Sequence, residues 1–176
     1  MSPSDLIEQV LILRCQIDDK QAFKELIERY QKPLRYFITS LLGNSDPAED
    51  IFQDTWLTVL RRIHTLRKTD MFPAWLYRIA RNNVYKELRR KRRLSTADET
   101  LVVQNDTEDV LFSPADAAKI HKCLEKLKHE YKEVLILRFL EQMSYHDIAK
   151  VTNCNLGTVK SRIYYAKRAL KREMEE

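Results

Sequence analysis

Arginine and lysine gather in residues 78–93, a segment with eight basic residues and one acidic residue. If the segment is helical, one side of it carries cations, an amide and a phenol ring: Arg78, Arg81, Asn82, Tyr85 and Arg89. Cations neutralise phosphate, while an amide can hydrogen-bond to bases and a ring can stack on them. This combination is therefore typical of a nucleic-acid-binding surface. A solvated helix face that ends in a basic tail would give the same pattern, and this segment alone does not separate the two interpretations.

A second basic segment lies near the carboxyl end, where residues 158–172 hold six basic residues and no acidic one. It follows a short predicted helix opened by Ser144 and the turn Asn153-Cys154-Asn155, in which Asn155 can cap the next helix. This order is typical of a helix-turn-helix, whose second helix enters the major groove of DNA. An ordinary corner between two helices is the alternative. The residues expected to face DNA are Gly157, Thr158, Lys160, Ser161, Tyr164, Tyr165 and Arg168.

Between the two basic segments lies a short acidic stripe. Asp50, Gln53 and Asp54 stand at i, i+3 and i+4, so they share one side of a helix that Pro47 is expected to open. Acidic groups repel DNA, and they suit docking on a basic protein surface. Taken alone, such a stripe is more often simply a solvated helix face.

Histidines and cysteines give little support for catalysis. His64, His121, His129 and His146 show no metal-ligand spacing, and His121 with Cys123 on one helix does not complete a tetrahedral site. The chain has no P-loop, no GxSxG and no GxGxxG motif. We therefore expect no catalytic residue, no metal and no cofactor.

Helices are the elements that must position these groups. The chain is 44% hydrophobic, which suffices for a core, and its 2 glycines and 5 prolines argue against a loop-rich β architecture. Apolar residues recur at helical spacing, which predicts an all-α protein. The recurring stretches are 6–17, 23–41, 51–63, 76–88, 120–127, 134–140, 148–151 and 159–170.

The segment 94–118 interrupts this pattern, with six acidic residues, no basic one and poor periodicity. We expect two small helical domains, at 1–93 and 114–176, joined by an acidic linker at 94–113.

Three separated cysteines without a CxxC pair suit a reduced compartment. No apolar run approaches the roughly 18 residues of a membrane span, and no secretion signal opens the chain. We expect a cytoplasmic protein with no membrane insertion.

Three blocks, in the same order, carry a family resemblance. AEDIFQDTW at 48–56 resembles AEDLVQETF, and WLYRIARN at 75–82 matches WLYRIA. SYHDIA at 144–149, followed by GTVKSR at 157–162, matches SYEEIA…GTVKSR. Over roughly residues 17–174 the chain resembles an extracytoplasmic-function (ECF) sigma factor, a specificity subunit of the sigma-70 family.

The resemblance implies that the first domain is sigma region 2 and the second is region 4. Asp50, Gln53 and Asp54 would then dock on the β′ coiled coil of core RNA polymerase, with the β flap and an anti-sigma factor as further partners. The resemblance also assigns a site for melted −10 DNA, in which a flipped base is captured at a cost of a few kcal/mol. Its residues would be Leu66, Arg67, Lys68, Phe72, Arg78, Arg81, Asn82, Tyr85 and Arg89.

The −35 duplex would be read by the last helix. Its residues would be Asn155, Gly157, Thr158, Lys160, Ser161, Arg162, Tyr164, Tyr165 and Arg168. Tyr165 stands where many relatives have arginine, which implies an altered base preference. We therefore expect a promoter-specificity factor that is not an enzyme, with an acidic linker that threads a basic channel of the polymerase. A stand-alone helix-turn-helix regulator and a small nuclease are the alternatives.

Overall fold

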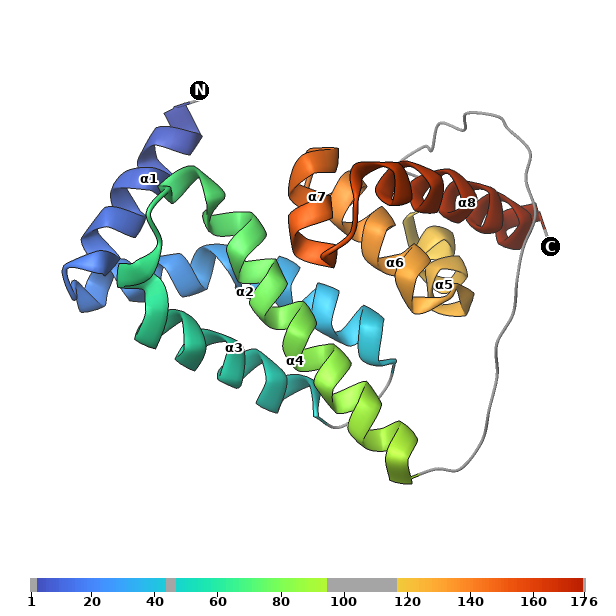
Figure 1. Cartoon of the computed structure of the whole chain (residues 1–176), viewed down its shortest axis with the longest axis horizontal. Coiled ribbons are helices and arrows are strands. Elements are labelled where there is room, and N and C mark those ends of the chain that lie inside the picture. Colours follow the sequence, from blue (N-terminus) through green and yellow to red (C-terminus); the bar gives the residue numbers. More distant parts are fainter. Residues whose placement is uncertain (1–2, 44–46, 95–116, 176) are drawn as a thin grey trace.

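The structure is a computed structural model that describes residues 3–43, 47–94 and 117–175 (Figure 1). Its described residues are helical, without strands, so the predicted all-α class is confirmed. The predicted linker beyond Leu94 and the predicted helix start at 113–114 lie outside the described residues. The elements are α1 (Pro3–Gln16), α2 (Lys20–Leu42), α3 (Ala48–Arg62), α4 (Phe72–Leu94), α5 (Ala117–Lys126), α6 (His129–Leu135), α7 (Tyr145–Thr152) and α8 (Leu156–Glu175).

Three short helical turns complete the described chain. The 3₁₀ turns Ile63–Thr65 and Thr69–Met71 connect α3 to α4, and the π-helical turn Ile136–Leu140 extends α6. The first four helices form one group and the last four form another, in agreement with two helical domains (Figure 1).

Helix boundaries follow local chemistry. The Asp19 carboxylate accepts hydrogen bonds from the backbone N–H groups of Gln21 and Ala22 at 3.0 and 3.1 Å, which caps α2. Gly43 ends α2 with φ at 66°, a left-handed conformation that glycine adopts without steric cost. Pro33 lies inside α2, which continues past it as one helix.

The first helical group encloses an aromatic and aliphatic core. The rings of Phe37 on α2 and Tyr77 on α4 meet edge to face, with centroids 5.1 Å apart. Trp56 on α3 packs in the same manner against Phe23 on α2, with centroids 5.8 Å apart. These contacts fix α3 and α4 on α2, and thereby fix the outward faces that carry the acidic stripe and the basic residues.

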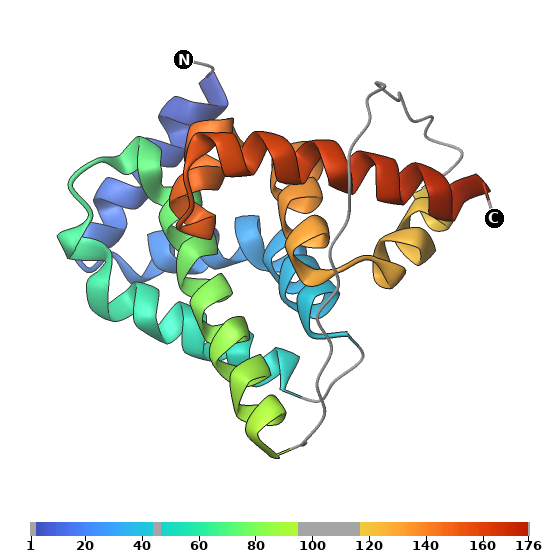
Figure 2. The same cartoon turned by 45° about the vertical axis from the view of Figure 1, so that its right-hand side comes forward.

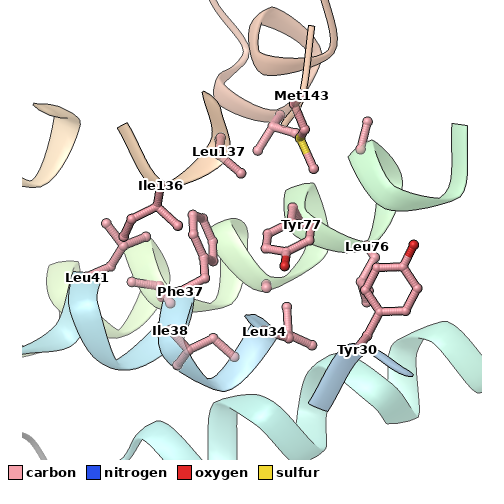
Figure 3. Packing of buried hydrophobic residues seen from close by; sticks show 14 of the residues in the cluster. Tyr30, Leu34, Phe37, Ile38, Leu41, Leu76, Tyr77, Ile136, Leu137 and Met143 are labelled. Atoms are coloured by element: carbon pink, nitrogen blue, oxygen red, sulfur yellow. The ribbon is translucent and has the colours of Figure 1, made fainter. Parts of the chain in front are cut away.

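The two helical groups share a continuous apolar core. Phe37 and Tyr77 of the first group lie beside Ile136, Leu137 and Met143 of the second, and all five are buried (Figure 3). Helix α7 packs directly against α4 (Figure 2). The charge pattern predicts two domains but not this close packing, which covers part of the basic face of α4.

Candidate nucleic-acid and polymerase interface

The basic face of α4 lies opposite its core face, as the spacing predicts. Leu76, Ala80 and Val84 are fully buried against the first domain. Arg78, Asn82 and Arg89 are exposed on the other side. The exposed end of α4 also lines a cleft of about 700 Å³ with α3; its residues include Asp54, Lys86, Arg89, Arg90 and Arg93.

Arg81 and Tyr85 lie on the same helix but are occupied by the second domain. The Arg81 Nε donates to the Glu133 carboxylate at 2.5 Å, and the Tyr85 hydroxyl donates to it at 3.4 Å. The Arg81 guanidinium also lies over the Tyr85 ring, 4.4 Å from its centroid. Burial raises the pKa of Glu133, and the Arg81 guanidinium opposes that rise. Burial also raises the pKa of the Tyr85 hydroxyl.

The loop before α4 is held in place from α1. The Gln16 side chain donates to the backbone carbonyls of Ile63 and Leu66 at 2.9 and 2.7 Å. This leaves Arg67 and Lys68 exposed and Leu66 partly buried. The loop therefore presents a basic surface next to the first turns of α4.

Phe72 was predicted to belong to the DNA-binding surface, but its ring is buried. Its side chain is 0% exposed, and its ring packs against Tyr30 and Trp75 with centroids 5.5 and 6.0 Å apart. Because no part of the ring reaches solvent, Phe72 anchors the loop in the core and leaves no face for a base. The prediction that it contacts DNA is wrong for this arrangement.

The helix-turn-helix has the predicted geometry. Ser144 caps α7, because its hydroxyl accepts from the backbone N–H of Asp147 at 3.1 Å. Three residues then separate α7 from α8, and Asn153 adopts a left-handed conformation with φ at 53°. The Asn155 side chain accepts from the backbone N–H of Thr158 at 2.7 Å and caps α8. Buried Val159 and Ile163 hold α8 against the rest of the domain.

The surface of α8 divides into two parts. Gly157, Lys160 and Ser161 are exposed near its start, next to the exposed cap Asn155, whereas Thr158 and Arg162 are partly buried. Farther along, Tyr165 and Arg168 line a groove of about 180 Å³ together with Lys126 of α5, Lys128 of the turn that follows it and Tyr131 of α6. The groove extends the cationic surface beyond α8 itself.

Tyr164 differs from the prediction. Its hydroxyl is buried and has no hydrogen-bond partner among the described residues. Its ring contacts Tyr165 edge to face, with centroids 5.2 Å apart. In this arrangement the hydroxyl therefore does not face a groove of DNA, and only Tyr165 of the pair borders the cationic groove.

The acidic stripe on α3 is exposed, and it is longer than predicted. Asp50, Gln53 and Asp54 all reach solvent. Leu57 and Leu60, which lie within the predicted apolar stretch 51–63, are 47% and 52% exposed and continue the same side of the helix. We call these five residues the α3 stripe. A helix face that combines carboxylates with exposed leucines is typical of a protein-docking surface rather than of a DNA-binding one.

Metal and membrane features are not found in the described part of the chain. No group of three or more His, Cys, Asp or Glu side chains there could hold a metal ion. None of the helices that the structure describes is long and apolar enough to cross a membrane.

A capped helix-turn-helix and a second basic helix, carried on one all-α framework, define a DNA-binding protein. Residues 26–94 match the family model of Sigma-70 region 2, and residues 117–170 match that of Sigma-70 region 4. The chain belongs to the ECF group of the sigma-70 family, and it is an RNA polymerase sigma factor that directs promoter-specific transcription initiation.

Curated relatives cover nearly the whole chain. The RNA polymerase sigma-H factor of Pseudomonas aeruginosa is 29% identical over 96% of this chain and 94% of its own. The ECF RNA polymerase sigma-E factor of Haemophilus influenzae is also 29% identical, over 97% of this chain and 96% of its own. The alignment therefore spans both helical domains and not the helix-turn-helix alone.

Solved structures are similar over the same span. The sigma factor RpoE of Bartonella quintana, solved with the anti-sigma factor NepR, is 28% identical with a TM-score of 0.70 over 87% of this chain and 96% of its own. CnrH, solved with the cytosolic domain of CnrY, has a TM-score of 0.68 over 96% of this chain and 97% of its own. At 23% identity, the likeness to CnrH shows the fold alone.

Proposed function

We propose that the α3 stripe is the surface that holds core RNA polymerase, at the β′ coiled coil. The exposed leucines Leu57 and Leu60 next to the carboxylates of Asp50 and Asp54 are the observation that carries this assignment. Burial of the leucines would supply binding free energy, while the carboxylates would steer the stripe toward a basic partner. The polar Gln53 between them adds a hydrogen-bonding group.

The basic face of α4 and the preceding loop are proposed to hold the melted −10 strand. Exposed Arg78 and Arg89 neutralise phosphates, and exposed Asn82 offers an amide to an unstacked base. Leu66, Arg67 and Lys68 border the same surface from the loop. Arg81 and Tyr85 would join this site only when Glu133 no longer occupies them. Melting is then driven by binding energy that only the opened strand provides.

The start of α8 is proposed to read the −35 duplex. Lys160 and Ser161 are exposed on the first turns of a helix whose N-terminus is capped by Asn155. In a helix-turn-helix these are the positions that reach base edges and phosphates. Arg162, Tyr165 and Arg168 extend the contact along the groove that borders α6.

The remaining roles follow from membership in the family. We propose that the chain performs no chemistry of its own and works in the cytoplasm, where polymerase and promoter DNA meet. We place the two domains at 1–93 and 114–176, with the acidic segment 94–113 between them. Similarity to RpoE, which was solved with the anti-sigma factor NepR, supports an anti-sigma partner for this chain too.

The affinity of the chain for core polymerase, measured without DNA, tests whether the α3 stripe is the docking surface. Asp54→Lys reverses one charge of the α3 stripe, and Leu57→Ala removes exposed apolar surface. Each is expected to weaken binding to core polymerase by about tenfold, or about 1.4 kcal/mol, in a titration followed by fluorescence anisotropy. Glu28→Lys on α2 makes the same charge reversal at an exposed site outside the stripe. Equal core affinity for all four proteins would remove the α3 stripe from the interface.

A further inference from the structure

A cavity of about 400 Å³ lies at the end of α2, where α2 meets α5 and α6. This end of α2 lies beside α6 (Figure 2). The polar groups that line the cavity come from three helices: Tyr36, Thr39 and Ser40 of α2, His121 and Glu125 of α5, and Lys132 of α6. The volume falls within the range of pockets that hold a small molecule, about 300–1,000 Å³. None of these residues belongs to the surfaces proposed above for DNA or polymerase.

Lys132 is the lining residue that indicates a ligand. It is only 6% exposed, and its ammonium forms neither an ion pair nor a hydrogen bond within the described part of the chain. Burial lowers the pKa of this ammonium, and the carboxylate of Glu125 opposes that effect. A buried cation without a partner costs solvation free energy. An anion in the cavity would supply the missing partner.

The Lys132 ammonium is also accessible from the cavity. Buried side-chain nitrogen and oxygen atoms without a hydrogen-bond partner are found at Trp56, Tyr77 and Tyr164 of the described residues, and the Lys132 ammonium is not one of them. The stem of Lys132 is therefore covered, while its nitrogen keeps some exposed surface. A lysine ammonium binds phosphate or carboxylate as a point charge with three donors.

The α2 and α5 sides of the cavity offer groups that suit ligand hydroxyls. The Thr39 hydroxyl donates to the backbone carbonyls of Arg35 and Tyr36 at 2.9 and 3.1 Å, so its oxygen is left as an acceptor. The Tyr36 hydroxyl and His121 Nδ1 share a hydrogen bond of 2.6 Å, which leaves Nε2 of the imidazole for a further partner. An acceptor oxygen and an imidazole nitrogen both pair well with a hydroxyl group.

Glu125 adds an exposed carboxylate to the same cavity. A carboxylate accepts hydrogen bonds from hydroxyl groups and repels a second anionic group. The cavity thus combines a buried cation with an exposed carboxylate. A ligand that matches this order has one anionic group for Lys132 and hydroxyl groups for the rest of the wall.

We propose that this cavity is a binding site for a small hydroxylated anion, a sugar phosphate or a sugar acid. The anionic group pairs with Lys132, and the hydroxyl groups donate to Thr39 and Glu125. The bound molecule contacts α2 on one side and α5 and α6 on the other. This site goes beyond promoter recognition and polymerase docking, and it does not depend on either assignment.

Isothermal titration calorimetry of the full chain tests the site, in a buffer without phosphate or carboxylate. The probes are ribose 5-phosphate, gluconate and, as the neutral comparison, ribose. Ribose 5-phosphate, gluconate or both are expected to bind at least about tenfold more tightly than ribose, because ribose gives Lys132 no counter-charge. Binding of only one anion identifies the group as phosphate or carboxylate. If neither anion binds more tightly than ribose, the proposal is overturned.

Lys132→Met then locates the binding site, because it removes the charge and keeps a long, unbranched side chain. It is expected to weaken binding of the anion by about tenfold or more. Without ligand, the variant should melt no lower than the wild type, since the solvation cost of the buried charge is gone. Lys122→Met makes the same change at an exposed lysine of α5 that does not line the cavity, and it should bind like the wild type.

Thr39→Val provides a second variant, at an exposed position where a valine keeps the shape of the side chain. It is expected to weaken binding of the hydroxylated anion by about fivefold and to change binding of inorganic phosphate by less than about twofold. The difference arises because phosphate alone has no hydroxyl group that must donate to Thr39. If Lys132→Met and Thr39→Val both bind the anion as tightly as the wild type, the binding site lies elsewhere and the proposal is overturned.

Discussion

Asn82 and Asn83 are neighbours in the chain, yet they do different things. Asn82 is exposed on the basic face of α4. The Asn83 amide instead donates to the hydroxyl of Thr55, a fully buried residue on α3, at 3.2 Å. One residue step on a helix turns a side chain by about 100°, which accounts for the difference. The sequence periodicity was sufficient to predict that Asn82 faces outward.

Asn82→Ala is expected to slow open-complex formation by about tenfold, while binding of the closed promoter duplex changes by less than about twofold. The amide would meet a base only after that base has left the stack, so its loss affects the opened state alone. Permanganate footprinting reports the melted bases, and a gel-shift at low temperature reports duplex binding. Asn83→Ala is the comparison, expected to lower the melting temperature and to leave the ratio of the two readouts unchanged. Equal losses in both readouts for Asn82→Ala would contradict base capture.

Other residues show where prediction from sequence ends. The family resemblance assigns Phe72 to the −10 site, but Tyr30, which lies far away in the chain, packs against its ring. Glu133 belongs to no recognisable motif, and its partner Arg81 lies 52 residues earlier. The Tyr164 hydroxyl is buried although its neighbours on α8 are polar. For Phe72 and Glu133, contacts with segments far away in the chain decide burial, and a local pattern does not contain those contacts.

At the scale of elements, the apolar spacing predicts helices better than it predicts their inward faces. Helix α1 forms over the predicted stretch, yet Leu6, Val10, Leu13 and Ile17 are exposed. The core is instead contacted by Leu11, Ile12 and Cys15, which lie on another side of the same helix. Leu57 and Leu60 on α3 likewise belong to a predicted apolar stretch and are exposed. Periodicity predicts that a helix with two apolar sides is a helix, but it does not say which of the two sides is covered.

Asp19 supplies a pH-dependent contribution to the stability of α2. The backbone N–H of Ala22 and the side chain of Arg14 hold the pKa of Asp19 below its ordinary value of 3.8. Because the pKa is depressed in the folded state, the stabilisation is present above the ordinary pKa and is lost as the pH falls through the depressed one. Asp19→Asn should therefore lower the melting temperature near neutral pH.

The test is a series of melting curves by circular dichroism, from about pH 7 to about pH 2. The difference between wild type and Asp19→Asn is expected to shrink steadily toward the acidic end. Asp18→Asn, at the exposed neighbouring residue, controls for the change in net charge. A difference that stays constant down to the lowest pH would show that the Asp19 charge does not stabilise the cap.

At the scale of the whole molecule, the charge pattern predicts two helical domains, and the two family matches fall on either side of the acidic segment. Their packing against each other was not predictable. Phe37 and Leu137 each fit the apolar stripe of their own helix, and a stripe carries no mark of whether it faces its own domain or another. This packing depends on apolar and ionic contacts that exist only once both domains have folded.

Run-off transcription tests the central claim most directly. Bacterial core polymerase is supplied with the purified chain and a library of promoter templates, and transcript starts are mapped by sequencing. The account predicts starts at a limited set of templates that share two upstream elements, with no such starts from core polymerase alone. It further predicts that Asp54→Lys reduces these starts, because it weakens core binding, and that a higher concentration of the variant restores them. Transcripts that begin at the same positions with and without the chain would contradict it.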